Sequence, residues 1–196
     1  MEFAAKKIAA YIENNKGCSS EERVIYEYGI QTGLEMVICA FVATVIAVIL
    51  EMFLQGVVFL VIFILLRSYA GGVHLKKFLS CFFCSVFVQT GVLLLTKYIQ
   101  LSIQISWCIL LFGIALLFLI SPVDHINRIL TKEEKKYCRK KLVLIVIGIV
   151  AISSIFSITE NKNYVSLISD TVIVVAVSAV AGKIKFHMDK SGRNVE

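Results

Sequence analysis

The residues from 33 to 66 form a nearly unbroken apolar stretch, and this stretch limits what the chain can fold into. As one α-helix it would be about 50 Å long, whereas the hydrocarbon core of a bilayer is about 30 Å thick. Glu51 and Gln55 fall near its middle, where burying a charge in lipid is costly. We therefore expect two membrane segments, about 33–50 and 52–66, joined by a turn that leaves Glu51 in water.

Four more apolar segments follow, at about 78–96, 104–121, 142–159 and 164–182, and each is long enough to cross a bilayer. Segment 52–66 is shorter, roughly 22 Å by helical rise, so a re-entrant segment is the alternative there. The chain is 58% apolar with a mean hydropathy of +0.84, which excludes an ordinary soluble domain. The predicted fold class is all-α: a polytopic integral membrane protein with about six hydrophobic segments and N-terminal amphipathic helices.

The residues before the first membrane segment are expected to form amphipathic helices on the membrane surface. The stretch from Glu2 to Asn14 has its apolar residues roughly on one side of a helix. A second helix is expected to begin near Ser19, because Ser19 and Glu22 have the spacing of a capping box. The stretch is too polar for a signal peptide.

The Lys and Arg residues are distributed unevenly about the predicted segments. With the N-terminus inside the cell, all but Lys97 and Lys162 of the 20 fall on the cytoplasmic side, as the positive-inside rule requires. Both termini are therefore predicted to be cytoplasmic. The formal charge of +6 indicates topology and anionic lipid, not nucleic acid, since the aromatic residues are not interleaved with the basic ones.

The chain is predicted to be a single domain over residues 1–196. Its parts are interfacial helices over 1–32, membrane segments over 33–182 and a basic cytoplasmic tail over 183–196. The polar stretch 122–141 is predicted to be the one large cytoplasmic loop, with a helical pattern in TKEEKKYCRKK.

Reactive side chains gather in the first cytoplasmic loop, which reads RSYAGGVHLKKFLSCFFC over residues 67–84. Gly71 and Gly72 permit positive φ and a close approach of another backbone. His74 can accept and return a proton near neutral pH, and Cys81 is a candidate nucleophile. In a continuous helix these two residues would differ in height by about 10 Å, whereas direct proton transfer needs about 3 Å. The chain must therefore fold back between them.

A helix that begins near Lys76 would place Cys81 in its first turns. A thiol at a helix N-terminus, beside a histidine and lysines such as Lys76 and Lys77, is expected to carry more thiolate than an ordinary one. The alternatives are that the thiol only packs, that His74 is interfacial and that the lysines mark topology. Cys84 would face a different side of a regular helix, and we interpret it as a packing residue.

A metal site is a further alternative, built from His74, Cys81 and Cys84 with a fourth ligand from a later loop. The spacing H-x6-C-x2-C matches no common zinc pattern, so we expect no metal and no other cofactor. The six cysteines also lack the spacing of a secreted disulfide framework. No acidic residue follows His74 closely enough to orient it. Glu35 and Asp124 could act only through space, so the sequence predicts a His–Cys pair without an assigned third member.

The motif R-x3-G-G-x-H-x6-C, formed by Arg67, Gly71, Gly72, His74 and Cys81, resembles the accessory gene regulator B (AgrB) family. The resemblance continues in SPVDHINRILTKEEKKYCRKK over residues 121–141, and in the length, the six-segment hydropathy and the amphipathic N-terminus. It implies an integral membrane cysteine endopeptidase of Gram-positive bacteria that cuts the propeptide AgrD of a quorum-sensing system. Carried over by position, Cys81 would be the nucleophile and His74 its base, while the other three residues belong to the motif without an assigned role.

The resemblance also implies a reaction course and partners. A Cys or Ser of the propeptide would attack the acyl-enzyme thioester and give a cyclic thiolactone or lactone autoinducing peptide. Family propeptides have an acidic tail, which the basic residues of loop 122–141 could steer toward Cys81; these include Lys135, Lys136, Arg139 and Lys140. The alternative is that they only set topology and bind anionic lipid. The family further implies a homodimer in the cell membrane, with its active site on the cytoplasmic side.

Two other functions stay open from the sequence. A small membrane transporter or export component would place polar residues or glycines at mid-membrane. The third to sixth segments offer few of these, namely Gln89, Thr90, Gly113, Gly148, Ser153 and Ser154. A non-catalytic scaffold or sensor is the other alternative. Replacement of Cys81 separates the hypotheses, since only the peptidase requires a thiol there.

Overall fold

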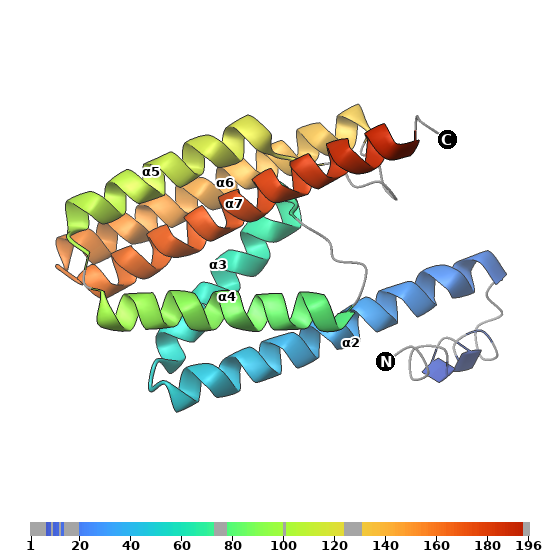
Figure 1. The fold of residues 1–196 in the computed structure, drawn as a ribbon, viewed down its shortest axis with the longest axis horizontal. Helices are drawn as coiled ribbons and strands as arrows, with labels where there is room; N and C mark the ends of the chain where they lie inside the picture. The colour runs from blue at the N-terminus through green and yellow to red at the C-terminus, as the bar shows by residue number, and fades with distance from the viewer. Residues whose placement is uncertain are drawn as a thin grey trace.

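The computed structural model describes residues 7, 8, 10, 11, 13, 20–72, 78–99, 101–123 and 131–193. Its long helices are α2 (Ser20–Ile49), α3 (Phe53–Ala70), α4 (Phe78–Tyr98), α5 (Ile103–Ile120), α6 (Lys132–Ile158) and α7 (Lys162–Arg193) (Figure 1). No strand occurs among the described residues, which confirms the all-α class. Each of these helices contains a stretch long and apolar enough to cross a membrane, so the six predicted segments are confirmed.

A tight turn separates α2 from α3, where the sequence predicted a hairpin. Glu51 occupies this turn with φ of 59° and is exposed, so its carboxylate stays outside the bundle. The N–H of Met52 donates to the carbonyl of Ala47 at 2.8 Å and closes the turn. In the first turn of α3, Gly56 lies so near α2 that an added Cβ would meet the Ala47 side chain. Small residues thus let the two helices approach closely.

α3 is longer than the predicted segment 52–66, because the helix continues to Ala70. Its 18 residues form one continuous helix of about 27 Å, close to the thickness of a bilayer core. Its length and continuity favour a full crossing over a re-entrant segment. Arg67 lies in the last turn, where the helix dipole favours a cation.

The helical pattern predicted in the stretch 122–141 is confirmed from residue 132 onward, and residues 124–130 lie outside the described ranges. α6 begins at Lys132 and runs without a break into the apolar residues up to Ile158. A capping box fixes its start: Thr131 Oγ1 accepts from the N–H of Glu134 at 3.2 Å, and the Glu134 carboxylate accepts from the N–H of Thr131 at 2.8 Å. The capping box predicted at Ser19 involves a residue outside the described ranges.

The predicted C-terminal tail is also largely helical. α7 continues past the expected end of the membrane segment at 182 and reaches Arg193. The added residues, KIKFHMDKSGR, include several good helix formers and no proline, so nothing local ends the helix earlier.

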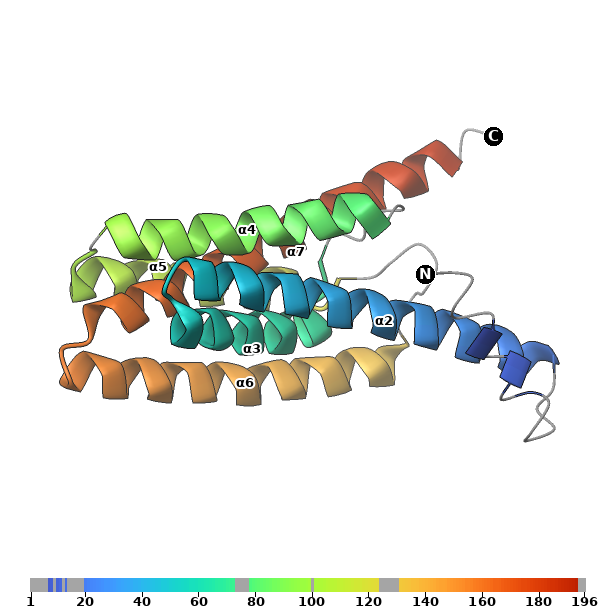
Figure 2. The same ribbon diagram turned by 90° about the horizontal axis from the view of Figure 1, so that it is seen from below.

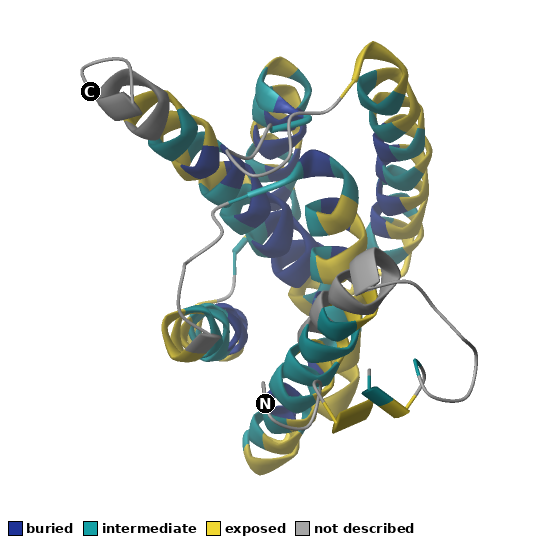
Figure 3. Cartoon of the chain, turned by 90° about the vertical axis from the view of Figure 1, so that its right-hand side faces the viewer, coloured by how far each residue is buried: buried dark blue, intermediate teal, exposed yellow. Residues whose placement is uncertain are grey.

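Two clusters of buried side chains hold the helices together (Figure 3). The larger cluster joins α3, α5, α6 and α7 and includes Leu66, Leu110, Leu117, Leu142, Ile168 and Val175. The smaller cluster joins α2, α3, α4 and α7 and includes Ala47, Phe59, Leu93 and Leu167. α3 and α7 contribute to both clusters, and α7 has the most buried of the six spans.

The helices alternate in direction, which brings the ends that matter for function together. The starts of α2, α4 and α6 and the ends of α3, α5 and α7 all lie toward the right in Figure 1. α4 and α6 lie on opposite sides of α3 (Figure 2). The outward faces expose large apolar side chains, among them Phe41, Phe87, Leu119 and Ile158. Such a surface suits lipid, in agreement with a multi-pass membrane protein.

Candidate functional site

The first turn of α4 carries Cys81, as predicted for a helix that begins nearby. α4 begins at Phe78, two residues later than the expected start near Lys76, and Cys81 is partly buried. The first N–H groups of a helix have no partner within the helix, so an anion is favoured there. His74, Lys76 and Lys77 lie outside the described residues, and their roles stay predictions.

Cys84, one turn further along α4, has a different environment from Cys81. Its side chain is exposed, whereas that of Cys81 is partly buried. The two thiols therefore differ in accessibility. Cys84 does not pack in the interior of this chain, which corrects its interpretation as a packing residue.

α2 runs parallel to α4, and two hydrogen bonds fix their register. Gln89 Nε2 donates to the carbonyl of Ala43 at 2.8 Å, and this pair is buried. Near the other end of α4, Lys97 Nζ donates to the carbonyl of Leu50 at 2.9 Å. The two bonds join residues that lie 46 and 47 positions apart. This offset places the first turn of α4 beside the first half of the membrane span of α2.

Glu35 and Cys39 lie on that part of α2. Cys39 is within electrostatic range of both Cys81 and Glu35. Gln31 Nε2 donates to Glu35 Oε1 at 3.0 Å, which orients the carboxylate along α2. Glu35, an acid that the sequence considered without assigning it a role, therefore lies in the neighbourhood of the candidate nucleophile. Asp124, the other acid considered, is outside the described residues.

Gly71 ends α3 in a conformation that favours glycine. Its φ is +83°, in the left-handed region, and its N–H donates to the carbonyl of Arg67 at 3.1 Å. A Cβ on Gly71 would lie 3.1 Å from Cβ and 3.2 Å from the carbonyl oxygen of Val123. The N–H of Val123 also donates to the carbonyl of Ala70 at 3.1 Å. Both properties predicted for the glycine pair, positive φ and close backbone approach, are confirmed at this residue.

Gly72 lies against two polar side chains. Arg67 Nη1 donates to Ser178 Oγ of α7 at 2.9 Å, and the guanidinium carbon lies 5.7 Å from the centroid of the Phe63 ring. A Cβ on Gly72 would lie 2.9 Å from Ser178 Oγ and 3.0 Å from Arg67 Nη1. The motif residues Arg67 and Gly72 are thus brought together, with Ser178 as their common neighbour.

We refer to Arg67, Gly71, Gly72, Val123 and Ser178 as the α3 junction. It joins the end of α3 to the residues after α5 and to the second half of α7. Its first three members were singled out in the sequence, but Val123 and Ser178 were not. Ser178 is 111 residues from Arg67, and no local pattern distinguishes it from the other serines of its helix.

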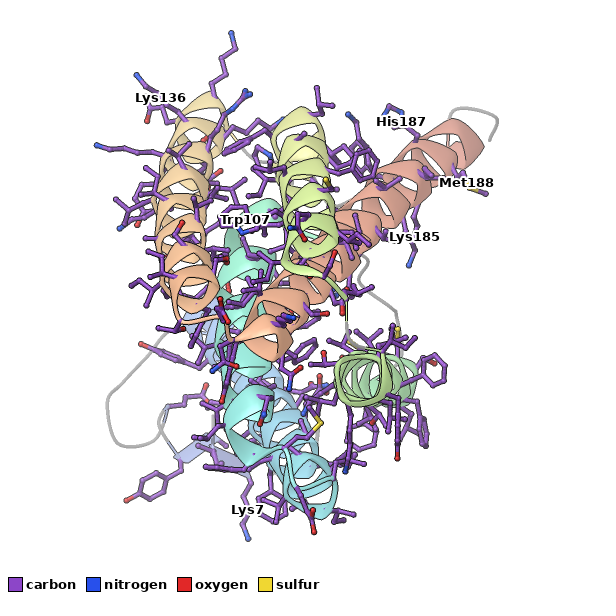
Figure 4. All side chains as sticks on the ribbon, turned by 90° about the vertical axis from the view of Figure 1, so that its left-hand side faces the viewer. Lys7, Trp107, Lys136, Lys185, His187 and Met188 are labelled. Atoms are coloured by element: carbon purple, nitrogen blue, oxygen red, sulfur yellow. The ribbon has the colours of Figure 1, made fainter. Side chains whose placement is uncertain are left out.

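The basic residues predicted to steer a substrate lie on the first turns of α6. Lys136, Arg139 and Lys140 are exposed and Lys135 is half-buried. Figure 4 shows Lys136 projecting away from the bundle at the end of α6. Because α6 and α4 lie on opposite sides of α3 (Figure 2), this basic face does not adjoin Cys81. Any influence on chemistry at Cys81 would act over a distance.

No metal site is assembled in the ranges that the structure describes. Within them, no group of three or more His, Cys, Asp or Glu side chains could hold a metal ion. Of the ligands considered from the sequence, Cys81 and Cys84 differ in exposure and His74 lies outside the described residues. The expectation that the protein uses no metal stays a prediction.

α7 carries polar residues that the sequence inventory of membrane segments omitted, namely Ser166, Ser169, Asp170 and Thr171. The hydroxyls of Ser169 and Thr171 donate to backbone carbonyls within α7, at 2.8 and 2.7 Å. Asp170 is half-buried and accepts from Ser166 Oγ at 3.4 Å. An acid within a membrane span is costly, so it points to a functional role. The signal that could have found it is simple: it is the one acidic residue in segment 164–182.

Comparisons with known proteins agree with the motif and the fold. A family model described as Accessory gene regulator B matches residues 5–179. AgrB-like proteins from two Clostridium perfringens strains, 13 and SM101, are each 24% identical over 170 residues, which cover 83% of this chain and 79% of each relative. An AgrB-like protein of Clostridium beijerinckii is 23% identical over 158 residues, covering 78% of this chain and 74% of the relative. No solved structure matches. The chain belongs to the accessory gene regulator B family.

Proposed function

We propose that this protein is a membrane-embedded cysteine endopeptidase that removes the C-terminal tail of an AgrD-like propeptide and promotes its cyclisation. Family membership associates the chain with peptide processing in accessory gene regulator quorum sensing and implies an AgrD-like partner. The observation that carries the finer proposal is the placement of Cys81. It is a partly buried thiol in the first turn of α4, seven residues after the motif histidine.

In the proposed reaction, His74 takes the proton of the Cys81 thiol. The thiolate attacks the carbonyl carbon at the boundary between the signal segment and the tail. The carbon–nitrogen bond then breaks, and the tail leaves as an amine that receives its proton from His74. An acyl-enzyme thioester is left on Cys81. The N–H groups in the first turn of α4, which have no partner within the helix, are suited to bind the developing oxyanion.

A Cys or Ser within the propeptide completes the reaction by attacking the thioester. A thiolactone or lactone forms, and Cys81 leaves as the thiolate. Exchange of one thioester for another is nearly balanced in free energy, so the cyclisation of a Cys-containing propeptide requires no ATP. The partly buried position of Cys81 among apolar helices supports this route, since limiting access of water disfavours hydrolysis of the acyl-enzyme.

The proposal places both termini and the site on the cytoplasmic side of the membrane. Its support is the uneven distribution of Lys and Arg together with the fold, in which the α3 junction, the start of α4 and the basic start of α6 lie toward one end (Figure 1). Because the basic face of α6 does not adjoin Cys81, we propose that it attracts the acidic tail or anionic lipid by long-range attraction. A homodimer, as the family implies, completes the proposal.

Transport is the second candidate function, and Asp170 is the observation in its favour. Its carboxyl lies half-buried in a membrane span beside Ser166. Carboxyl groups in such places often mark pathways for protons or ions. A transport role predicts that Asp170→Asn lowers export of the product while Cys81→Ala leaves export of a preformed peptide unchanged.

Replacement of Cys81 tests the proposed function directly. We expect Cys81→Ala to lower release of the tail by more than about a thousandfold, because a nucleophile that forms a covalent intermediate has no substitute. The measurement is co-expression with an AgrD-like propeptide, followed by mass analysis of the tail and of the cyclic product.

Cys84→Ala is the matched control, because it removes a thiol one turn away on the same helix. We expect this variant to release the tail at the wild-type rate. If the Cys81→Ala protein inserts correctly and still releases the tail at the full rate, the peptidase hypothesis is wrong. The transporter and scaffold hypotheses then remain.

A further inference from the structure

We propose that Ser178 of α7 is a positioning residue of the peptidase site. It holds the Arg67 guanidinium against Gly72 and thereby fixes the point from which the chain leads to His74 and Cys81. This inference rests on the proposed function and deepens it. It assigns a role to a residue outside the R-x3-G-G-x-H-x6-C motif.

The Arg67 guanidinium is held from two directions. Its Nη1 donates to Ser178 Oγ at 2.9 Å, and its plane lies near the Phe63 ring, 5.7 Å from the ring centroid. Phe63 and Arg67 are one turn apart on α3, so the ring alone can only guide the guanidinium along its own helix. Ser178 supplies the contact to a different helix. The bond therefore fixes the end of α3 relative to α7.

The space around Gly72 shows how closely the Arg67–Ser178 bond is packed against the backbone. The space that a Cβ would occupy is bounded by Ser178 Oγ at 2.9 Å and Arg67 Nη1 at 3.0 Å. A side chain at this position would therefore push the Arg67 and Ser178 side chains away from their observed positions. Gly71 is held independently by Val123. The backbone at both glycines is thus fixed by contacts to other parts of the fold.

Few residues separate Gly72 from the proposed catalytic residues. His74 is two residues after Gly72, and α4 begins at Phe78. Two residues of extended chain span at most about 7 Å, so the position of Gly72 limits where His74 can lie. Misplacement of a reacting group by about 1 Å can cost roughly a hundredfold in rate. A hydroxyl far from the thiol can therefore control its activation.

The test measures the reactivity of Cys81 relative to Cys84 in the full-length protein in liposomes. The probe is iodoacetamide at neutral pH, and the extent of alkylation at each cysteine is read by peptide mass spectrometry. We expect Ser178→Ala to slow alkylation of Cys81 by about tenfold, because the base is displaced from the thiol. The rate at Cys84, which is exposed on the same helix, should not change.

Ser169→Ala is the matched control. It is the same substitution on the same helix, at a buried serine whose hydroxyl donates only to the carbonyl of Ser166 within α7 among the bonds the structure describes. It should leave both alkylation rates unchanged. A second pair, Ser178→Thr and Ser178→Val, separates the hydrogen bond from side-chain shape. Thr retains the acceptor and should keep Cys81 reactive, whereas Val should behave like Ala.

The outcomes separate this inference from the proposed function. His74→Ala is included as the reference for loss of the base. If His74→Ala slows alkylation of Cys81 and Ser178→Ala does not, the positioning role is overturned and the peptidase proposal stands. The positioning role is also overturned if Cys81 is alkylated at equal rates in Ser178→Thr and Ser178→Val. Equal slowing at Cys81 and Cys84 in Ser178→Ala would overturn it as well. If His74→Ala leaves the Cys81 rate unchanged, the proposed activation of the thiol fails first.

Discussion

The helices around α7 and the α2–α4 pair are held together in different ways. In the most apolar 18 residues of α7, 61% of the residues are buried, compared with 12% in the corresponding part of α2. The first group is joined by apolar side chains from α3, α5, α6 and α7. Contact between α2 and α4 combines the smaller apolar cluster with two hydrogen bonds, from Gln89 to Ala43 and from Lys97 to Leu50. Of the six described spans, that of α7 is thus the most buried and that of α2 the least.

The candidate site lies across the boundary between these regions. The α3 junction is fixed against α7, whereas Cys81 is carried by α4 and is only partly buried. This division has a clear chemical use. In the proposed mechanism, the backbone that leads to His74 is anchored on the packed side, and the thiol is on the side with more open surface for a peptide to approach. Three substitutions test whether the regions differ as described.

The largest effect is expected from a clash in the packed region. A Cβ on Gly113 of α5 would lie 3.0 Å from Val172 Cγ1 and 3.3 Å from the backbone nitrogen of Ile173. We expect Gly113→Leu to lower the free energy of unfolding by about 1–3 kcal/mol, since overpacking forces neighbours to shift. Gly91→Leu in α4 is the matched control, because nothing lies within 4 Å of its Cβ position. Thermal unfolding in detergent would compare them, and equal losses would contradict the contrast.

An intermediate effect is expected from the buried hydrogen bond between α2 and α4. Gln89→Leu removes the donor to the Ala43 carbonyl but keeps a side chain of similar size. We expect a loss of about 0.6 kcal/mol and no more than about 1.7 kcal/mol, the range measured for hydrogen bonds between membrane helices. The same unfolding measurement applies, with Gln104→Leu at an exposed position of α5 as reference. A loss larger than that of Gly113→Leu would reverse the ranking of the two regions.

The smallest effect is expected at the exposed end of the same helix pair. Lys97→Met removes the ammonium that donates to the Leu50 carbonyl. Lys97 is exposed, so the change in unfolding free energy should stay within about 0.5 kcal/mol. A cysteine cross-link between positions 47 and 93, which belong to the smaller apolar cluster, would show whether the two helices still meet. Failure of this cross-link in the Met variant would show that one surface contact holds the pair, which the comparison does not expect.

Much of the fold could be predicted because lipid leaves few choices. The hairpin at Glu51 followed from the cost of burying a carboxylate, and the structure has it in an exposed turn. Segment ends were less accurate. α3 continues to Ala70 and α6 begins at Lys132, because helices extend past the hydrocarbon wherever local hydrogen bonding and caps allow. Hydropathy has no information on such polar helical turns.

The site was predicted in part. The sequence identified Cys81 near a helix start and the need for glycine at Gly71, since both follow from local spacing and backbone sterics. It did not find Ser178, and it did not show that α4 and α6 lie on opposite sides of α3. The spacing of apolar residues along the chain does not reveal which helices become neighbours in the fold.

By itself the sequence determined that the chain forms six apolar helices, because a segment in hydrocarbon must satisfy its own backbone hydrogen bonds. It also determined that the thiol and the glycines lie at the junction between the second and third segments. Only the tertiary structure decided that Arg67 meets Ser178 and that α4 and α6 lie apart. The physical reason is that contacts between distant helices depend on how side-chain shapes fit across interfaces, and lipid is equally compatible with many such arrangements.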